Sequence, residues 1–398
     1  MSARRIILSV TNDLVTDQRV HRTCTALHEA GYEVTLIGRL LPGSKPLQRP
    51  YRTQRMRLLF RRKALFYAEY NCRLFLRLLF SRADVYYAND TDTLPANYLA
   101  ARLRRKALLY DSHELFTEVP ELVGRPRVKR FWRRIEDCIV PRIKQAENMT
   151  ALTVSQSFAD VFRDRYGIAM GVVRNVPMGA AQPSAAAQAE AERLRARLPR
   201  DKHLLLYQGA VNVGRGVEWV MNAMPYLPDC HYVIAGVGDL YDELRRRAAS
   251  GPAAERITFM GRLEPDVLRA FTASASMGLA LLENRGISYY YTLPNRIADF
   301  IHAGVPILAT DFPEVRRVLQ AYPVGTLVPP QPFNDKTLSS IPPDPVQLAQ
   351  QIHDALDFWT RCDRATRQTL FAAAAADLSW DHDKKILLHH IDTILSAC

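Results

Sequence analysis

The stretch Leu204-Leu-Leu-Tyr-Gln-Gly-Ala-Val-Asn-Val-Gly-Arg-Gly216 begins as an apolar run and ends in a glycine-containing turn. Such a run predicts a buried β-strand that leads through a loop into a helix. Gly209, Gly214 and Gly216 would let backbone N–H groups approach phosphate oxygens, and Arg215 adds a forked cation. An ordinary turn between a strand and a helix fits the same residues, because isolated glycine patterns are weak signals.

Short apolar runs alternate with helical patterns on both sides of this stretch. We expect strands at residues 6–10, 32–37, 84–88, 107–110 and 150–154, and again at 204–207, 232–235, 257–259, 277–282, 306–309 and 325–328. This alternation predicts parallel sheets with helices on both faces. The expected fold class is therefore α/β, with two Rossmann-like domains.

The chain of 398 residues suits two such domains better than one core. A composition shift rich in Ala, Gln, Glu and Arg follows Asn175-Val-Pro177. We expect a first domain at residues 1–178, a linker at 179–199 that includes a helix, a second domain at 200–379, and a C-terminal helix at 380–398 that crosses back to the first domain. Ligands bind at the carboxyl ends of parallel strands, so we expect the two sheets to face a central cleft.

Composition narrows the class of protein. Six scattered cysteines without a C-x-x-C pair argue against disulfides or zinc and predict a cytoplasmic protein. The apolar run at residues 6–10 is too short for a signal peptide, and we expect no membrane-spanning segment. The net charge of +12 suits phosphate-bearing small molecules or an anionic membrane surface. Nothing resembles a nucleic-acid-binding module, so we expect no nucleic acid partner.

The stretch Leu293-Pro-Asn-Arg-Ile-Ala-Asp-Phe-Ile-His-Ala-Gly-Val-Pro-Ile307 predicts a short helix that stops at a glycine before the next strand. Arg296 and Asp299 lie three residues apart and share a helix face. Arg296 could meet phosphate and Asp299 could accept hydrogen bonds from ribose hydroxyls, although Asp299 could equally serve the helix dipole. A second glycine turn contains Gly236 and follows the strand at 232–235.

In the first half, polar residues follow two predicted strands. Tyr110-Asp-Ser-His-Glu-Leu115 places Asp111, His113 and Glu114 at a strand end, where they suit charge stabilisation or proton handling. The loop after the first strand adds further polar side chains, of which Asp17 could be only a helix cap. The expected acceptor-side residues are Asn12, Asp13, Asp17, Arg19 and Glu114.

Residues 57–82 form a basic, aromatic-rich stretch with helical periodicity. Arg62, Glu69, Arg73 and Arg77 fall roughly on one stripe, and Leu, Phe and Tyr fill the other faces. This pattern predicts a helix that packs on the first sheet. Its excess of arginine also suits a peripheral contact with anionic lipid.

In order and spacing, seven segments resemble glycosyltransferase family 4, which has the two-domain GT-B architecture. They are residues 11–20, 111–114, 174–177, 208–216, 234–236, 259–261 and 294–306. The resemblance spans nearly the whole chain. It implies transfer of a sugar, with retention, from a nucleotide diphosphate sugar to a glycan or lipid-linked acceptor, without a metal or other cofactor. It also implies a place in surface polysaccharide or glycoconjugate synthesis on the inner face of the membrane.

The resemblance also implies roles for single residues. Arg215 matches the basic residue that grips the donor phosphates, and Arg296 stands in for a second one. Asp299 matches the second acid of a Glu-x7-Glu pattern, which holds the ribose, and His113 matches a histidine near the donor sugar. The expected catalytic residues are His113, Arg215 and Arg296, and the expected donor-binding residues are Gly209, Gly214, Gly216, Gly236, Asn295 and Asp299.

Alternatives remain, because Tyr291 stands where the pattern has its first acid. Glu283 could supply that acid if residues 284–293 loop out. Without it, the chain could be a nucleotide-sugar-binding subunit that lacks catalysis, or a nucleotide-sugar epimerase of the same fold. A nicotinamide dehydrogenase is the weakest alternative, because no G-x-G-x-x-G follows the first strand.

Overall fold

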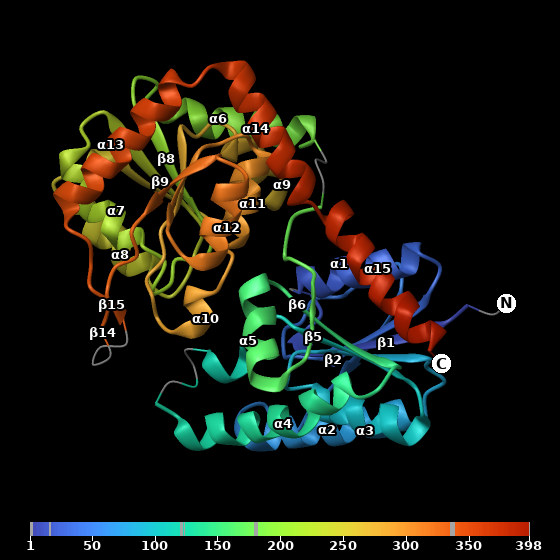
Figure 1. Cartoon of the computed structure of the whole chain (residues 1–398). Helices are drawn as coiled ribbons and strands as arrows, with labels where there is room; N and C mark the ends of the chain where they lie inside the picture. The colour runs from blue at the N-terminus through green and yellow to red at the C-terminus, as the bar shows by residue number, and fades with distance from the viewer. Residues whose placement is uncertain are drawn as a thin grey trace. The chain divides into compact units, whose positions relative to one another are not determined.

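The computed structural model describes residues 3–15, 17–119, 122, 124–178, 182–334 and 339–397, which form two compact units (Figure 1). Unit 1 comprises Met1–Asn175 together with Asp383–Cys398, and unit 2 comprises Val176–His382. Each unit carries a parallel sheet with helices around it. The α/β fold class expected from the sequence is confirmed.

The described part of unit 1 contains a seven-stranded sheet in the order β3-β2-β1-β4-β5-β6-β7, and its neighbouring strands are parallel. The five strands expected from apolar runs are present. Two short strands at the edges, β3 and β7, were not expected. The strands are β1 (Arg5–Asp13), β2 (Glu33–Arg39), β3 (Arg52–Met56), β4 (Val85–Asn89), β5 (Ala107–Ser112), β6 (Met149–Thr153) and β7 (Gly171–Val172).

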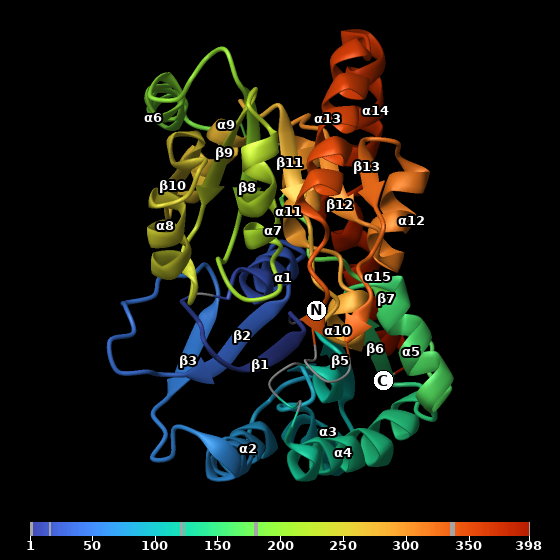
Figure 2. The ribbon, with the colours of Figure 1, turned by 90° about the vertical axis from the view of Figure 1, so that its left-hand side faces the viewer.

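Helices cover both faces of this sheet. Figures 1 and 2 show α2, α3 and α4 side by side along one face, with α1 on the other. The predicted helix at 57–82 is shorter than expected, because residues 57–62 form a loop that leads into α2. The helices are α1 (Gln18–Glu29), α2 (Lys63–Leu79), α3 (Leu94–Arg104), the 3-10 turn η1 (Phe116–Glu118), α4 (Pro126–Lys144) and α5 (Gln156–Tyr166).

The ends of α1 follow from local sequence. The Oδ1 atom of Asp17 accepts a hydrogen bond from the backbone N–H of Val20 at 3.1 Å and so satisfies one free donor of the first turn. Gly31 ends the segment with a φ of 91°, a left-handed conformation that glycine adopts without a steric cost. Asp17 is therefore a helix cap.

The C-terminal helix α15 (Trp380–Ser396) returns to unit 1 from Asp383 onward. Asp383 is fully buried and pairs with the guanidinium group of Arg174, with 2.7 Å between Oδ1 and Nη2. Further along the helix, the side chain of Lys384 pairs with Glu29 at the end of α1. The predicted crossing of this helix back to the first domain is confirmed.

Unit 2 contains a six-stranded parallel sheet in the order β10-β9-β8-β11-β12-β13, within the described residues. Strands β8 and β9 are buried along nearly their whole length, as the continuous apolar runs predict for a parallel sheet. Two short antiparallel strands, β14 and β15, pair within the proline-rich stretch at residues 329–345. The strands are β8 (His203–Gln208), β9 (Cys230–Ala235), β10 (Ile257–Gly261), β11 (Met277–Ala280), β12 (Ile307–Thr310), β13 (Gly325–Val328), β14 (Phe333–Asn334) and β15 (Ser339–Ser340).

The helices of unit 2 form two connected sets. Helix α7 contacts α13, whereas α6, α9, α11 and α14 contact one another in series. In the described part of the chain, no helix is long and apolar enough to cross a bilayer. The helices are α6 (Ala185–Ala196), α7 (Val217–Ala223), η3 (Met224–Tyr226), α8 (Tyr241–Ala249), η4 (Ala254–Arg256), α9 (Pro265–Thr272), α10 (Ile287–Tyr290), α11 (Asn295–His302), α12 (Pro313–Ala321), α13 (Pro345–Arg361) and α14 (Arg364–Asp377).

Candidate active site

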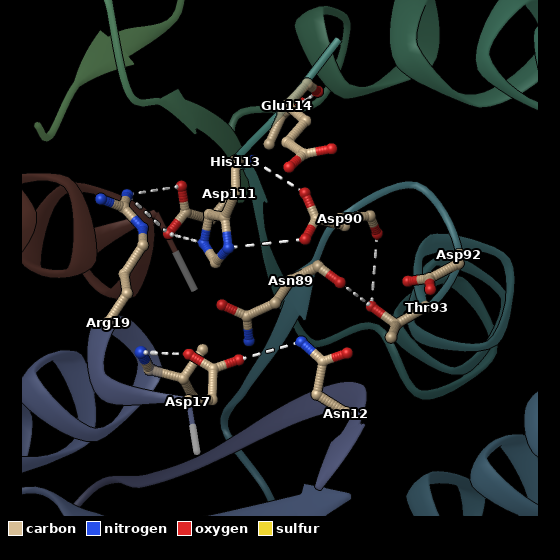
Figure 3. Close-up of polar contacts among 12 residues, drawn as sticks. Asn12, Asp17, Arg19, Asn89, Asp90, Asp92, Thr93, Asp111, His113 and Glu114 are labelled. Carbon is tan, nitrogen blue, oxygen red and sulfur yellow. Dashed lines mark hydrogen bonds and ion pairs between the residues drawn. The ribbon is translucent and has the colours of Figure 1, made fainter. Parts of the chain in front are cut away.

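Each unit has a polar cluster at the carboxyl ends of its central strands, where parallel sheets bind ligands. In unit 1 the cluster follows β1, β4 and β5 (Figure 3). In unit 2 it follows β8 and β11. The two clusters are described in turn.

In unit 1, the imidazole of His113 lies between two carboxylates (Figure 3). Its Nε2 is 3.0 Å from Oδ2 of Asp111, and its Nδ1 is 3.4 Å from Oδ2 of Asp90. The backbone N–H of His113 also donates to Asp90, at 2.8 Å. Burial alone would lower the pKa of His113, but the two carboxylates outweigh it and raise this pKa. The arrangement therefore favours an imidazolium that donates from both ring nitrogens.

Asp111 is almost fully buried and is the centre of this cluster. It accepts hydrogen bonds from the hydroxyl of Tyr87 at 2.8 Å and from Nη2 of Arg19 at 3.2 and 3.3 Å. Burial would raise the pKa of Asp111, but Arg19 and His113 hold it well below its usual range. Asp111 is thus a permanent anion that fixes the imidazole and a buried arginine.

Two further acids, Asp90 and Asp92, belong to this cluster. They were not predicted from the sequence. Asp90 follows β4 in a left-handed conformation with a φ of 61°, which is uncommon for a residue other than glycine. Burial raises the pKa of Asp90. Asp92 accepts a hydrogen bond from the hydroxyl of Thr11 at 2.6 Å, and burial together with the Asp90 charge raises its pKa to about 7. The run Asn89-Asp-Thr-Asp-Thr93 at the end of a predicted strand is the signal that could have identified them.

Three of the other residues expected on the acceptor side, Asn12, Asp13 and Asp17, have polar partners of their own. Asn12 donates to the second carboxylate oxygen of Asp17 at 3.2 Å, beside the helix cap. Asp13 lies 3.8 Å from Arg55 and accepts from Ser44, so its side chain points toward β3. Glu114 is exposed. Arg19 joins the His113 cluster through its pair with Asp111.

In unit 2, the loops after β8 and β9 pack closely. Gly209 and Gly236 have φ values of 126° and 152°, and a Cβ atom on Gly236 would lie 1.8 Å from the carbonyl oxygen of Gly209. Only glycine fits at position 236, because any side chain would overlap backbone. This packing explains Gly236 without a ligand.

Arg296 reaches from α11 to the end of β8. Its guanidinium group lies 4.3 Å from the centre of the Tyr207 ring, and its Nη2 donates to the Tyr207 hydroxyl at 3.3 Å. A Cβ atom on Gly209 would lie 3.4 Å from Nη2. The side chain is only 7% exposed, and Nη1 is buried with no hydrogen-bond partner among the described residues. A buried cation without a full set of partners beside a glycine turn is suited to an anionic ligand.

Arg215 lies in the loop between β8 and α7, with its guanidinium group 5.3 Å from the centre of the Tyr289 ring. Its Nε is buried without a hydrogen-bond partner in the described structure. The N–H of Glu283 donates to the carbonyl oxygen of Gly214 at 3.0 Å, so Glu283 lies beside this loop. Burial raises the pKa of Glu283, although Arg285 opposes this at a distance of 3.4 Å.

Asp299 has a different neighbourhood from Arg215. It accepts a hydrogen bond from the side-chain amide of Gln208 at 3.1 Å, and Gln208 accepts one from Thr272 at 2.8 Å. These residues line a cavity of about 1330 Å³ in unit 2, together with residues of α6 and α9. Asn295 is exposed at the start of α11, and Gly216 precedes α7 with a φ of 68°.

Two family models match the chain, one in each half. Residues 17–180 match the model described as "Glycosyltransferase Family 4", and residues 202–357 match the model described as "Glycosyl transferases group 1". No curated protein matches the sequence.

Several solved structures are similar over the full length. Sucrose-phosphate synthase from Thermosynechococcus elongatus has a TM-score of 0.74 at 18% identity, over 99% of this chain and 100% of that one. A glycosyltransferase from Rickettsia africae has a TM-score of 0.71 at 11% identity, over 100% and 99%. HepE of Anabaena in complex with UDP-glucose has a TM-score of 0.70 at 14% identity, over 98% and 99%. At these identities the likeness shows the fold, which is GT-B.

Proposed function

The chain belongs to the glycosyltransferases of family 4, and on this premise we propose that it moves a sugar from a nucleotide diphosphate sugar to a glycan or lipid-linked acceptor. We propose that the transfer proceeds with retention of configuration at the sugar. The product would belong to a surface polysaccharide or another glycoconjugate made on the cytoplasmic side of the membrane.

The environment of Arg296 carries this proposal. Its guanidinium group is held by the Tyr207 ring and hydroxyl, while Nη1 is buried without a hydrogen-bond partner among the described residues. Because a buried cation is costly unless it is paired, this position favours an anion. The diphosphate of a nucleotide sugar is such an anion, and a guanidinium group can hold it with two parallel hydrogen bonds.

Arg215 supplies a second cation from the loop between β8 and α7, and its Nε is likewise buried without a partner in the described chain. As the bond between the sugar and the diphosphate breaks, negative charge grows on the leaving group. Cations placed beforehand where charge develops lower the barrier without reorganisation. We therefore propose that Arg215 and Arg296 stabilise the leaving diphosphate, and that His113 acts on the reacting sugar.

The nucleotide is proposed to be a uridine diphosphate. HepE, which shares the fold, has been solved in complex with UDP, with UDP-glucose, and with UDP and glucose. A thermal-shift panel of nucleotides and nucleotide sugars tests this directly. A ligand that binds only the folded state should stabilise it by about 2.7 kcal/mol at 100 times its dissociation constant. Stabilisation by no nucleotide diphosphate would contradict the proposal.

A matched pair of variants makes the test specific. Arg296→Gln should weaken UDP binding about 10- to 150-fold, because a hydrogen bond to a charged group contributes roughly 1.5–3 kcal/mol. Arg361→Gln in α13 is the control, since it also removes one arginine from unit 2 but from a side chain that is 82% exposed. Calorimetry on both proteins should show a loss only for the first.

We also propose that transfer needs no metal or other cofactor, because the two arginines provide positive charge at the diphosphate. Activity should then be unchanged after dialysis against EDTA. Loss of activity in EDTA that manganese or magnesium restores would overturn this part of the proposal.

A second candidate function rests on Tyr291, which occupies the position of the first acid in the family pattern. The chain would then bind nucleotide sugar without transferring it. Incubation with a labelled nucleotide sugar separates the candidates. Release or transfer of the sugar indicates a transferase, conversion of the donor without acceptor indicates an epimerase, and binding without any product indicates a binding subunit.

A further inference from the structure

Unit 1 has a pocket, separate from the His113 cluster, where β2 and β3 end. Its volume is about 300 Å³. The residues that line it come from the segments directly after these two strands and from the first turns of α2. They are Arg39, Leu40, Leu41, Pro42, Arg57, Leu58, Phe60, Arg61 and Phe66.

The lining of this pocket combines cations with apolar side chains. Arg39, Arg57 and Arg61 contribute three positive charges, and none of the described lining residues is acidic. The guanidinium group of Arg39 lies 4.9 Å from the centre of the Phe66 ring, and its Nε is buried with no hydrogen-bond partner in the described residues. Such a lining attracts an anion that carries apolar groups.

The loop that supplies four of the nine lining residues is fixed to α2. The carboxylate of Glu69 accepts hydrogen bonds from the backbone N–H groups of Leu59 and Phe60, at 2.8–3.0 Å. Arg73 pairs with Glu69 at 2.7 Å and donates to the carbonyl oxygen of Arg57 at 3.2 Å. The arginines of this loop are therefore attached to a backbone of defined position, as a binding pocket requires.

Several apolar side chains at and beside the pocket are exposed. Leu59 and Leu65 are 79% and 58% exposed, and Phe60, which lines the pocket, is 45% exposed. Exposed apolar side chains also occur on α2 and α4, with Leu76 and Phe131 among them. Figures 1 and 2 show these two helices along the same face of the sheet. Exposed apolar side chains mixed with arginines are typical of contact with a lipid surface.

We propose that this pocket binds the phosphate group of a lipid, with the lipid chain lying over Leu59, Phe60 and Leu65. Guanidinium groups match the geometry of phosphate oxygens, and the apolar side chains match the hydrocarbon. The inference rests on the proposed function and extends it, because it names a phosphate-bearing lipid as the molecule held on the acceptor side. The lipid is either a prenyl phosphate or an anionic glycerolipid, which share this chemistry.

Calorimetry with soluble probes tests the proposal on the full chain. The probes are farnesyl phosphate, dihexanoyl phosphatidic acid, dihexanoyl phosphatidylcholine and inorganic phosphate. One of the first two should bind at least about tenfold more tightly than inorganic phosphate, a difference that corresponds to the burial of about two CH₂ groups. The tighter of the two identifies the source of the lipid. Equal binding of inorganic phosphate, or equal binding of the zwitterionic phosphatidylcholine, would overturn the proposal.

Variants with matched charge locate the site. The double variant Arg57→Gln/Arg61→Gln should lose about tenfold or more in affinity for the tighter lipid probe. The control Arg127→Gln/Arg130→Gln removes two exposed arginines from α4, outside the pocket, and should retain full affinity. An equal loss of lipid affinity in both double variants would indicate general charge attraction and would overturn the proposal that the pocket binds the lipid. Phe60→Ser should weaken lipid binding while leaving inorganic phosphate binding unchanged.

UDP binding distinguishes this proposal from the proposed function. The Arg57→Gln/Arg61→Gln protein should bind UDP as the unaltered protein does, which also shows that it is folded. Lipid binding without UDP binding in the unaltered protein would contradict the proposed function alone. UDP binding without lipid binding would contradict only the proposal that the pocket binds a lipid phosphate.

Discussion

Arg174 and Asp383 are 209 residues apart in sequence, yet they form an ion pair whose carboxylate is fully buried. Asp383 also accepts a hydrogen bond from the backbone N–H of Arg174. Through these contacts the second turn of α15 is attached to the end of the unit 1 chain. The pair thus attaches the C-terminal helix to unit 1, although unit 2 lies between the two residues in the sequence.

Asp383→Asn should destabilise unit 1 by about 3 kcal/mol, at the low end of what breaking a buried ion pair costs, because Arg174 keeps partial access to solvent. Urea unfolding followed by circular dichroism measures the change. Asp381→Asn is the control, since Asp381 is exposed on the same helix and should leave stability unchanged. Equal stability of the two variants would show that the pair contributes nothing.

The cluster around His113 predicts a stability that depends on pH. The raised pKa of His113 means that its contribution is fully present below the unfolded value of 6.5 and is lost as pH rises through the folded value. The free energy of unfolding should therefore fall as pH rises above 6.5, and His113→Gln should flatten this decline. A rise in stability over the same range in the unaltered protein would refute the charged imidazole.

Asp92 should also make the free energy of unfolding fall as pH rises, but over a lower pH range than His113. Its folded-state pKa of about 7 exceeds the ordinary value of 3.8, so stability is lost as pH rises between these values. Asp92→Asn, which keeps the shape of the side chain, should remove this part of the pH profile and leave the part due to His113. An unchanged profile below pH 7 would show that Asp92 ionises normally.

Arg215 should affect turnover more than binding, because the charge on the leaving diphosphate grows in the transition state. Arg215→Ala should lower kcat on the order of 100-fold, by analogy with the loss of one preorganised donor, and Arg215→Lys should restore only part of it. His113→Ala should lower kcat while the affinity for UDP stays nearly intact, since His113 belongs to unit 1. Steady-state kinetics beside calorimetry with UDP would contradict this assignment if His113→Ala abolished UDP binding.

Asp299 offers a test of the expected ribose contact. Asp299→Asn keeps the shape of the side chain but removes its charge, and should weaken UDP binding about 10- to 150-fold if the carboxylate holds ribose hydroxyls. The hydrogen bond from Gln208 gives a structural alternative. A thermal unfolding curve of the variant without ligand separates the two, because a purely structural role lowers stability and leaves the UDP affinity unchanged.

Local sequence determined the elements of this protein. Strand β8 and its glycine loop were predicted because buried parallel strands are continuous apolar runs, and their turns need glycine. Strand β3 was missed because its sequence, Arg-Thr-Gln-Arg-Met, belongs to a sheet edge that stays partly exposed and carries no apolar pattern. The charged stripe of α2 was predicted from the sequence. That Glu69 and Arg73 of this stripe fix the preceding loop was not predicted.

Tertiary structure alone decided which polar residues meet. Asp90 and His113 contact each other because β4 and β5 are neighbours in the sheet. Local sequence patterns do not predict the order of strands in a sheet. The same order places Asp13 beside Arg55. Arg39 joins Arg57 and Arg61 because β2 pairs with β3. Sequence periodicity reports the burial of single elements, whereas the sites depend on long-range pairing that only the folded chain establishes.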